Sequence, residues 1–266
     1  MRVGIFDSGL GGLSVLHRAR KMMPEHDYIF YADEEHVPYG EKTAEQVRGY
    51  VDEIINYLIS REVDIIIIAC NTATSAIDRE DRSRFPVPIV GMEPAVKRAL
   101  DLYGGEAERI LVCATPITIR GAKMDNLMKH VDVHHKVDLV ALPGLVRFAE
   151  KGVFEGEEVE EYLKEALAEL ELERYGSVVL GCTHFNYFKN VFIKCFPHKP
   201  HFIDGNEGTI KQAMRLLDAG RNERGNKINT AEPGSVEFLF SGRPLTDKDR
   251  AFLRLCMNQL DKVFDI

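Results

Sequence analysis

The sequence predicts an α/β fold with mostly parallel sheets flanked by helices. Short apolar runs alternate with amphipathic stretches along the 266 residues, which is the pattern of repeated strand–helix units. The runs are rich in Ile and Val and lack polar–apolar alternation, which indicates strands covered on both faces of a parallel sheet. Two runs end in a cysteine, Cys70 or Cys182, followed by small polar residues. Because this theme occurs once in each half, we expect two pseudo-symmetric domains.

The first half alternates strands and helices in a regular order. The predicted strands are residues 2–6, 28–32, 64–69 and 89–91, and the predicted helices are residues 13–23, 42–61 and 94–102. Paired glycines at 104 and 105 punctuate the chain, so they mark a candidate break after these four strands.

A second strand–helix series follows this break. Its predicted strands are residues 109–114, 137–139 and 177–181, and its predicted helices are residues 118–128 and 157–171. In the last helix, apolar residues recur at helical spacing and would bury one stripe: Val159, Leu163, Ala166, Leu167 and Leu170.

The tail after residue 206 contains an amphipathic helix, a polar stretch at 222–234, a strand at 236–240 and a helix at 247–257. We expect this tail to return to the first half, because the sheet there otherwise lacks a cover at one side. The predicted domains are therefore residues 1–96 with 210–266, carrying Cys70, and residues 97–209, carrying Cys182.

Composition narrows the class of protein. The chain has 34 Lys and Arg against 42 Asp and Glu, and its net charge of −8 argues against a nucleic-acid surface, which needs clustered basic residues. No secretory signal is visible, and no apolar run approaches the roughly 20 residues that span a bilayer. Five scattered cysteines are too few for a disulfide scaffold. We therefore expect a cytoplasmic protein with reduced thiols and no membrane partner.

Cys70 and Cys182 differ from the other cysteines because each lies where an apolar strand gives way to polar residues. Ligands of open α/β sheets bind beyond the carboxyl ends of the strands. A nearby helix N-terminus there lowers the pKa of a thiol, and a cysteine base needs this because a free thiol is only a few per cent ionised at pH 7. Two such thiols could remove a proton from one face of a carbon and return one to the other.

A glycine-rich segment, Asp7-Ser8-Gly9-Leu10-Gly11-Gly12, follows the first predicted strand. Such turns expose backbone N–H groups that suit carboxylates or phosphates. The segment is neither a dinucleotide fingerprint, because Ser14 stands where the third glycine is required, nor a P-loop, because no Gly-Lys-Ser/Thr follows. Asp7 and Ser8 either cap a helix or contact a catalytic group or a substrate ammonium at the edge that carries Cys70.

Other loops add polar candidates. His184 is next but one to Cys182, so it is placed to pair with that thiol, and Glu150 is a candidate partner to orient it. Thr115 and Thr118 follow a predicted strand and would add hydroxyls to the same rim. The spacing of cysteines and histidines lacks the paired ligands of a zinc site, and no pyridoxal lysine or flavin motif is present. We therefore expect no metal and no cofactor.

Four blocks of sequence, in order, resemble glutamate racemases. The blocks are residues 6–16 (FDSGLGGLSVL), 38–40 (PYG), 69–73 (ACNTA) and 181–184 (GCTH). They keep the order and approximate spacing of that family. The resemblance implies a cofactor-independent isomerase that interconverts L- and D-glutamate and supplies D-glutamate for bacterial peptidoglycan. It also implies two α/β domains with the active site in the cleft between them, and a homodimer.

The resemblance implies roles at matching positions. Cys182 would deprotonate L-glutamate and Cys70 would deprotonate D-glutamate, while Asp7 and His184 assist at the neighbouring thiols. The implied substrate-contacting or supporting positions are Asp7, Ser8, Tyr39, Gly40, Asn71, Thr72, Thr183 and His184, with Thr115, Thr118 and Glu150 as looser matches.

The chain departs from the family pattern in two places. Phe185-Asn186 replace a frequent Tyr-Pro, and residues 33–37 (DEEHV) are unusually acidic. Neither departure touches the cysteines, so the expected activity stands.

Three other functions compete with this interpretation. A racemase of the same fold could act on aspartate or a related compound, since pocket depth sets selectivity for side-chain length. A cysteine hydrolase could use Cys182 and His184, but it would need only one thiol. An inactive binding module would leave the paired cysteines without a role.

Overall fold

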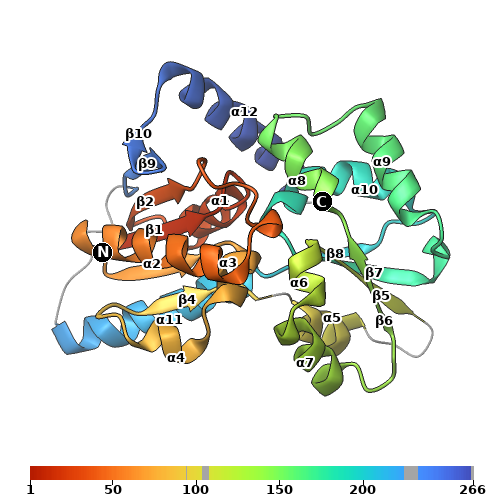
Figure 1. The fold of residues 1–266 in the computed structure, drawn as a ribbon, viewed down its shortest axis with the longest axis horizontal. Helices are drawn as coiled ribbons and strands as arrows, with labels where there is room; N and C mark the ends of the chain where they lie inside the picture. The colour runs from red at the N-terminus through yellow and green to blue at the C-terminus, as the bar shows by residue number, and fades with distance from the viewer. Residues whose placement is uncertain (94, 104–107, 225–232, 265–266) are drawn as a thin grey trace.

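The computed structural model describes residues 1–266 except 94, 104–107, 225–232 and 265–266. Two mostly parallel sheets flanked by helices make up these residues, which confirms the predicted α/β class (Figure 1). The first sheet has the strand order β10-β9-β2-β1-β3-β4. Its strands are β1 (Arg2–Asp7), β2 (Asp27–Ala32), β3 (Ile65–Ile68), β4 (Ile89–Gly91), β9 (Val236–Phe240) and β10 (Arg243–Pro244). Only β10 runs antiparallel to its neighbour.

Strand β3 shows why the first sheet is covered on both faces. Its four isoleucines are fully buried, and alternate ones point to opposite faces. Ile65 and Ile67 join the core that contains α1 (Leu13–Met22) and α11 (Asn206–Arg224). Ile66 and Ile68 join a second core under α2 (Ala44–Ser60). Short elements between β2 and β4 complete this half: η1 (Tyr39–Glu41), α3 (Asn71–Ala76) and α4 (Arg79–Ser83).

The second sheet has the order β6-β5-β7-β8 and is parallel throughout. Its strands are β5 (Arg109–Ala114), β6 (Val137–Ala141), β7 (Tyr175–Leu180) and β8 (His201–Asp204). One face packs on α5 (Val96–Tyr103) and α7 (Ala122–Val131). The other packs on α8 (Pro143–Glu150), α9 (Glu157–Leu167) and α10 (Lys189–Cys195). The remaining elements are α6 (Pro116–Arg120), η2 (Leu172–Arg174) and η3 (Thr183–Phe188).

The end of the chain packs against its beginning. β9 pairs in parallel with β2, with Val236 beside Tyr28 and Phe240 beside Ala32. The last helix, α12 (Asp247–Val263), contacts both α1 and η3. Within this contact Gln259 Nε2 donates a 2.8 Å hydrogen bond to the carbonyl of Tyr187. The tail therefore belongs to the first sheet and also supports the segment that follows β7.

Several predicted elements differ from the structure. The single helix predicted at 118–128 is wrong: α6 and α7 are separate, because the backbone at Gly121 is extended. The helix predicted at 157–171 ends at Leu167 instead. The predicted break at 104–106 lies outside the described residues. None of the described helices combines the length and the apolar character that crossing a membrane requires.

Candidate active site

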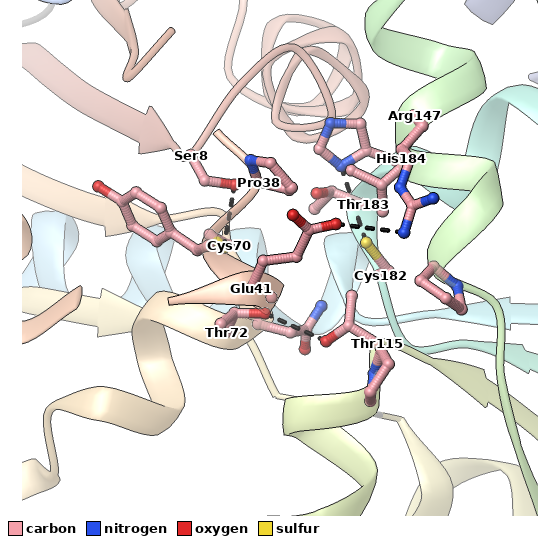
Figure 2. Close-up of a pocket in the computed structure, with 16 residues that line it drawn as sticks. Ser8, Pro38, Glu41, Cys70, Thr72, Thr115, Arg147, Cys182, Thr183 and His184 are labelled. Atoms are coloured by element: carbon pink, nitrogen blue, oxygen red, sulfur yellow. Dashed lines mark hydrogen bonds and ion pairs between the residues drawn. The ribbon is translucent and has the colours of Figure 1, made fainter. Parts of the chain in front are cut away.

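The two candidate thiols line one cavity. Cys70 follows β3 and Cys182 follows β7, so each lies just beyond the carboxyl end of a parallel strand in a different sheet. Figure 2 shows Cys70 and Ser8 on one side of this cavity and Cys182 and His184 on the other. Both thiols therefore line the same cavity, and the expectation that they border one bound molecule stays a prediction.

The cavity has the size of a small molecule. Its volume is about 170 Å³, and a cavity of roughly 150 Å³ is known to hold a benzene-sized guest. The residues that line it are Ser8, Pro38, Tyr39, Gly40, Glu41, Cys70, Asn71, Thr72, Thr115, Pro116, Pro143, Val146, Arg147, Cys182, Thr183 and His184. Most of the candidates from the sequence are among them. Asp7, Thr118 and Glu150 are not among them, and their roles at the site stay predictions.

Cys70 is held as a thiol. It occupies the N-cap of α3, where its Sγ accepts a 3.4 Å hydrogen bond from the N–H of Ala73 and lies 3.6 Å from Ser8 Oγ. Burial, with the nearby negative charge of Asp7, nevertheless raises the pKa of Cys70 to about 12. The N–H of Ala73 at this helix N-terminus does lower the pKa of Cys70, as expected, but desolvation disfavours the thiolate more, so the net shift is upward.

Asp7 lies behind the cavity wall and connects the two sides. It is fully buried at the end of β1, and its Oδ1 accepts a 3.1 Å hydrogen bond from Ser8 Oγ. Its Oδ2 accepts a 2.8 Å hydrogen bond from Thr183 Oγ1. Burial raises the pKa of Asp7 above its usual range, although His184 and these two hydroxyls oppose the shift. The carboxyl group of Asp7 therefore links Ser8, beside Cys70, to Thr183, beside Cys182.

His184 bridges Cys182 and Glu150. Its Nδ1 lies 3.7 Å from Cys182 Sγ, and its Nε2 bonds Glu150 Oε1, which also accepts a 2.9 Å hydrogen bond from the N–H of Leu10. Burial disfavours the imidazolium, yet the bonds to Cys182 and Glu150 outweigh it, and the pKa of His184 lies well above its usual value. His184 therefore lies beside the Cys182 thiol with its other ring nitrogen held by Glu150.

The glycine-rich turn makes room for this arrangement. A Cβ on Gly11 would collide with the His184 ring and with Thr183 Oγ1. A Cβ on Gly9 would collide with the carboxyl group of Glu150. Because these two positions are glycines, His184, Thr183 and Glu150 can pack against the turn between β1 and α1.

Amide and hydroxyl groups supply the remaining polar lining. Asn71 Oδ1 is buried and has no hydrogen-bond partner among the described residues, so it is an acceptor available to a bound ammonium. Thr72 Oγ1 lies 3.3 Å from Thr115 Oγ1, which in turn lies 2.9 Å from Thr118 Oγ1. Thr118 therefore orients Thr115 rather than lining the cavity. Its predicted role in direct substrate binding stays a prediction.

Tyr39 is fixed by the acidic loop that precedes it. Its hydroxyl donates a 2.6 Å hydrogen bond to Asp33 Oδ2, and His36 Nδ1 lies 2.9 Å from the same carboxylate. Ser241, which follows β9, donates a 3.3 Å hydrogen bond to Asp33 Oδ1. The tail of the chain thus helps to position Tyr39 and, beside it, Gly40 at the cavity.

The sequence interpretation missed two charged lining residues. Arg147 Nη2 and Glu41 Oε1 form an ion pair 3.2 Å long. The two residues lie 106 positions apart in elements, η1 and α8, that belong to different halves. No periodicity or motif links them, so only the fold brings them together.

Comparison with known proteins identifies the family of this chain. The sequence profile of the Asp/Glu/hydantoin racemase family matches residues 14–213. A glutamate racemase of Campylobacter concisus is 44% identical over 99% of this chain and 95% of its own length. Glutamate racemase 2 of Bacillus subtilis is 45% identical over 94% of this chain and 92% of its own length.

Solved structures agree as well. The crystal structure of glutamate racemase from Thermus thermophilus, in complex with β-chloro-D-alanine, superimposes with a TM-score of 0.78. It is 27% identical, and the match covers 96% of this chain and 92% of that one. The resemblance found in the four sequence blocks is confirmed by these relatives, and the chain belongs to the Asp/Glu/hydantoin racemase family, which makes it an isomerase.

Proposed function

We propose that this protein interconverts L- and D-glutamate through two cysteine acid/base groups, without a cofactor. The observation that carries the proposal is the pair of thiols, Cys70 and Cys182, that line one small cavity from the ends of strands in two sheets. Its relatives named above are glutamate racemases, and they match over nearly the whole chain.

Two opposed thiols meet the stereochemical demand of the reaction. A single base can return a proton only to the face from which it came, so inversion needs a second group on the other face. With L-glutamate bound, the Cys182 thiolate takes the proton from Cα and the Cys70 thiol gives its own proton to the opposite face. The thiol and thiolate have then exchanged, and the reverse reaction starts from D-glutamate.

The environments of the two thiols suit this starting state. The raised pKa of Cys70, caused by burial and by Asp7, keeps it protonated as the acid. His184, whose pKa is raised by its bonds to Cys182 and Glu150 despite burial, lies beside Cys182 Sγ. These environments are consistent with the proposed roles, in which Cys182 deprotonates L-glutamate and Cys70 deprotonates D-glutamate.

Substrate groups find partners in the cavity lining. The α-carboxylate would accept hydrogen bonds from hydroxyls and from backbone N–H groups near Ser8, Thr72 and Thr183, which also disperse charge as the carbanion develops. The orphaned Asn71 Oδ1 would accept from the ammonium. Tyr39, Gly40 and Thr115 would complete the contacts.

The direct test measures optical rotation or circular dichroism with each glutamate enantiomer, in the presence of a chelator. Racemisation with incorporation of solvent deuterium at Cα is the expected result. Aspartate enantiomers, run in parallel, decide between glutamate and the shorter substrate. Hydrolase activity on glutamate amides without racemisation would contradict the proposal.

Single substitutions test the two-base step. Cys70→Ser and Cys182→Ser should each lower kcat at least about 1,000-fold, because general acid and base groups contribute about 100- to 10,000-fold. Cys195→Ala is the matched control, since Cys195 lies on α10 and outside the cavity lining. Full activity in either cavity variant would exclude the two-base mechanism.

The proposal extends to the wider role. We infer that the product serves bacterial peptidoglycan synthesis in the cytoplasm. We also infer that the chain forms two domains, residues 1–96 with 210–266 and residues 97–209. The enzyme is further proposed to be a homodimer. Sheet membership of β9 and β10 supports the domain division. Light scattering on the purified protein tests the dimer, and rescue of a D-glutamate auxotroph tests the metabolic role.

A further inference from the structure

The ion pair between Glu41 and Arg147 joins the two sides of the cavity. Glu41 ends η1, on the side of the first sheet, and Arg147 lies on α8, on the side of the second. Figure 2 shows the dashed line between them crossing the cavity that also contains Cys70 and Cys182. Both side chains are more than half exposed, 55% for Glu41 and 62% for Arg147. The pair therefore lies at the open side of the cavity.

Arg147 is the cation of this lining that the catalytic machinery does not use. Among the residues that line the cavity, the other basic side chain is His184, which is buried and bonded to Cys182 and Glu150. The rest of the lining offers thiols, hydroxyls, an amide and apolar groups. The side-chain carboxylate of a dicarboxylate substrate would therefore find one guanidinium in this lining, that of Arg147. In the structure this guanidinium is paired with the carboxylate of Glu41.

An exposed ion pair of this kind contributes little stability, so its partners exchange readily. Arginine is suited to the exchange because its planar group binds carboxylates through two parallel hydrogen bonds. We propose that Arg147 is a specificity-determining residue that binds the side-chain carboxylate of an acidic substrate, and that Glu41 occupies Arg147 until the substrate displaces it. This inference rests on the proposed function, because it names how that same site would select a dicarboxylate.

The mechanism makes Glu41 an internal competitor of the substrate. Removing its charge should free Arg147 and strengthen substrate binding. Removing the guanidinium should weaken binding, and in that background the charge of Glu41 should no longer matter. This non-additivity separates carboxylate exchange from a general loss of structure.

The experiment compares Arg147→Met, Glu41→Gln and the double variant. Arg147→Met should raise KM for glutamate about three- to tenfold with little change in kcat, as expected for one charge-assisted contact near solvent. Glu41→Gln should lower KM about two- to threefold. The double variant should match Arg147→Met alone, and Arg147→Lys should recover part of the loss.

A second readout is independent of turnover. Glutarate and butyrate are probes that differ in one carboxylate and cannot racemise. Arg147→Met should weaken glutarate binding, measured by calorimetry or as a Ki, and leave butyrate binding unchanged. Added KCl should weaken glutarate binding to the unsubstituted protein more than to Arg147→Met, because salt screens exposed charges.

Matched controls remove the same charges elsewhere. Arg120→Met and Glu45→Gln alter exposed residues that do not line the cavity, and both should leave KM unchanged. An unchanged glutarate affinity in Arg147→Met, or a KM that rises in Glu41→Gln, overturns the inference. Absence of glutamate racemisation in the unsubstituted protein would instead contradict the proposed function, while the glutarate measurement would still decide the role of Arg147.

Discussion

Thr183 Oγ1 donates a 2.8 Å hydrogen bond to Asp7 Oδ2, across 176 positions of sequence. Thr183 follows Cys182, and Asp7 precedes Ser8, whose hydroxyl lies 3.6 Å from Cys70 Sγ. A continuous set of polar contacts therefore runs from the neighbour of one thiol to the other thiol. The carboxyl group of Asp7 lies at the centre of these contacts, so a substitution of Asp7 should change the pKa of Cys70.

Asp7→Asn should make the Cys70 thiol more acidic. The negative charge of Asp7 helps to raise the pKa of Cys70, second to burial, so the neutral amide removes part of the shift. In a Cys182→Ser background, the pH midpoint for alkylation of Cys70 by iodoacetamide should move to lower pH. A midpoint that stays in place or moves upward would show that Asp7 does not act on Cys70 through its charge.

Glu150→Gln should lower the pKa of His184. The carboxylate of Glu150 stabilises the imidazolium, so its loss allows His184 to become neutral at lower pH. The His184 ring resonance in NMR spectra should titrate at lower pH, and kcat/KM should fall about 10- to 100-fold in both directions. Glu157→Gln, which removes an exposed carboxylate on α9, is the control and should change neither quantity.

Gly11→Ala should damage catalysis, whereas Gly49→Ala should stabilise the fold. A methyl group at Gly11 would displace His184 and Thr183, and a misplacement of about 1 Å can cost about 100-fold in rate. Gly49 lies inside α2 with no atom within 4 Å of an added Cβ, so alanine there should add about 0.5–1 kcal/mol to the free energy of unfolding. Steady-state kinetics and urea denaturation of both variants measure these opposite effects.

Glu34→Gln should stabilise the protein increasingly as the pH rises. Burial, together with the nearby charge of Glu150, raises the pKa of Glu34 to about 8 in the folded state. A raised folded-state pKa gives stability that is full below the unfolded pKa and is lost as the pH rises through the folded pKa. The gain in Tm of Glu34→Gln should therefore grow from pH 5 to pH 9, while the exposed neighbour Glu35→Gln should show no such trend. A constant difference in Tm would mean that Glu34 is not buried as a neutral acid.

The elements predicted well from the sequence are those with a strong local signal. Strand β3 is a run of four isoleucines, and the predicted helix 42–61 brackets α2, which Thr43 begins with a capping box. Strand β8 was missed because it is a four-residue edge strand after Pro200, with His201 exposed and Phe202 partly exposed. Only two apolar residues, Phe202 and Ile203, stand between the polar His201 and Asp204, so this segment offers no apolar run.

The site was predictable to the extent that its residues follow strand ends. Cys70, Cys182 and His184 were singled out for that reason, and all three line the cavity. The partners that act across the cleft were not predictable from local chemistry. Glu41 lies on η1 and Arg147 on α8, and the two residues meet only because the fold places α8 beside the first half of the chain. Neither segment alone contains a pattern that predicts this contact.

The position of β9 has a consequence for synthesis on the ribosome. The edge of β2 that β9 covers stays open until residues 236–240 have been made, long after β1 to β8 have been translated. A nascent chain therefore exposes an unpaired strand edge during the last stage of elongation, and such edges invite association with other chains. Slow translation or truncation before residue 236 should accordingly favour aggregation and recruit chaperones, even though every side chain that lines the cavity has already been made.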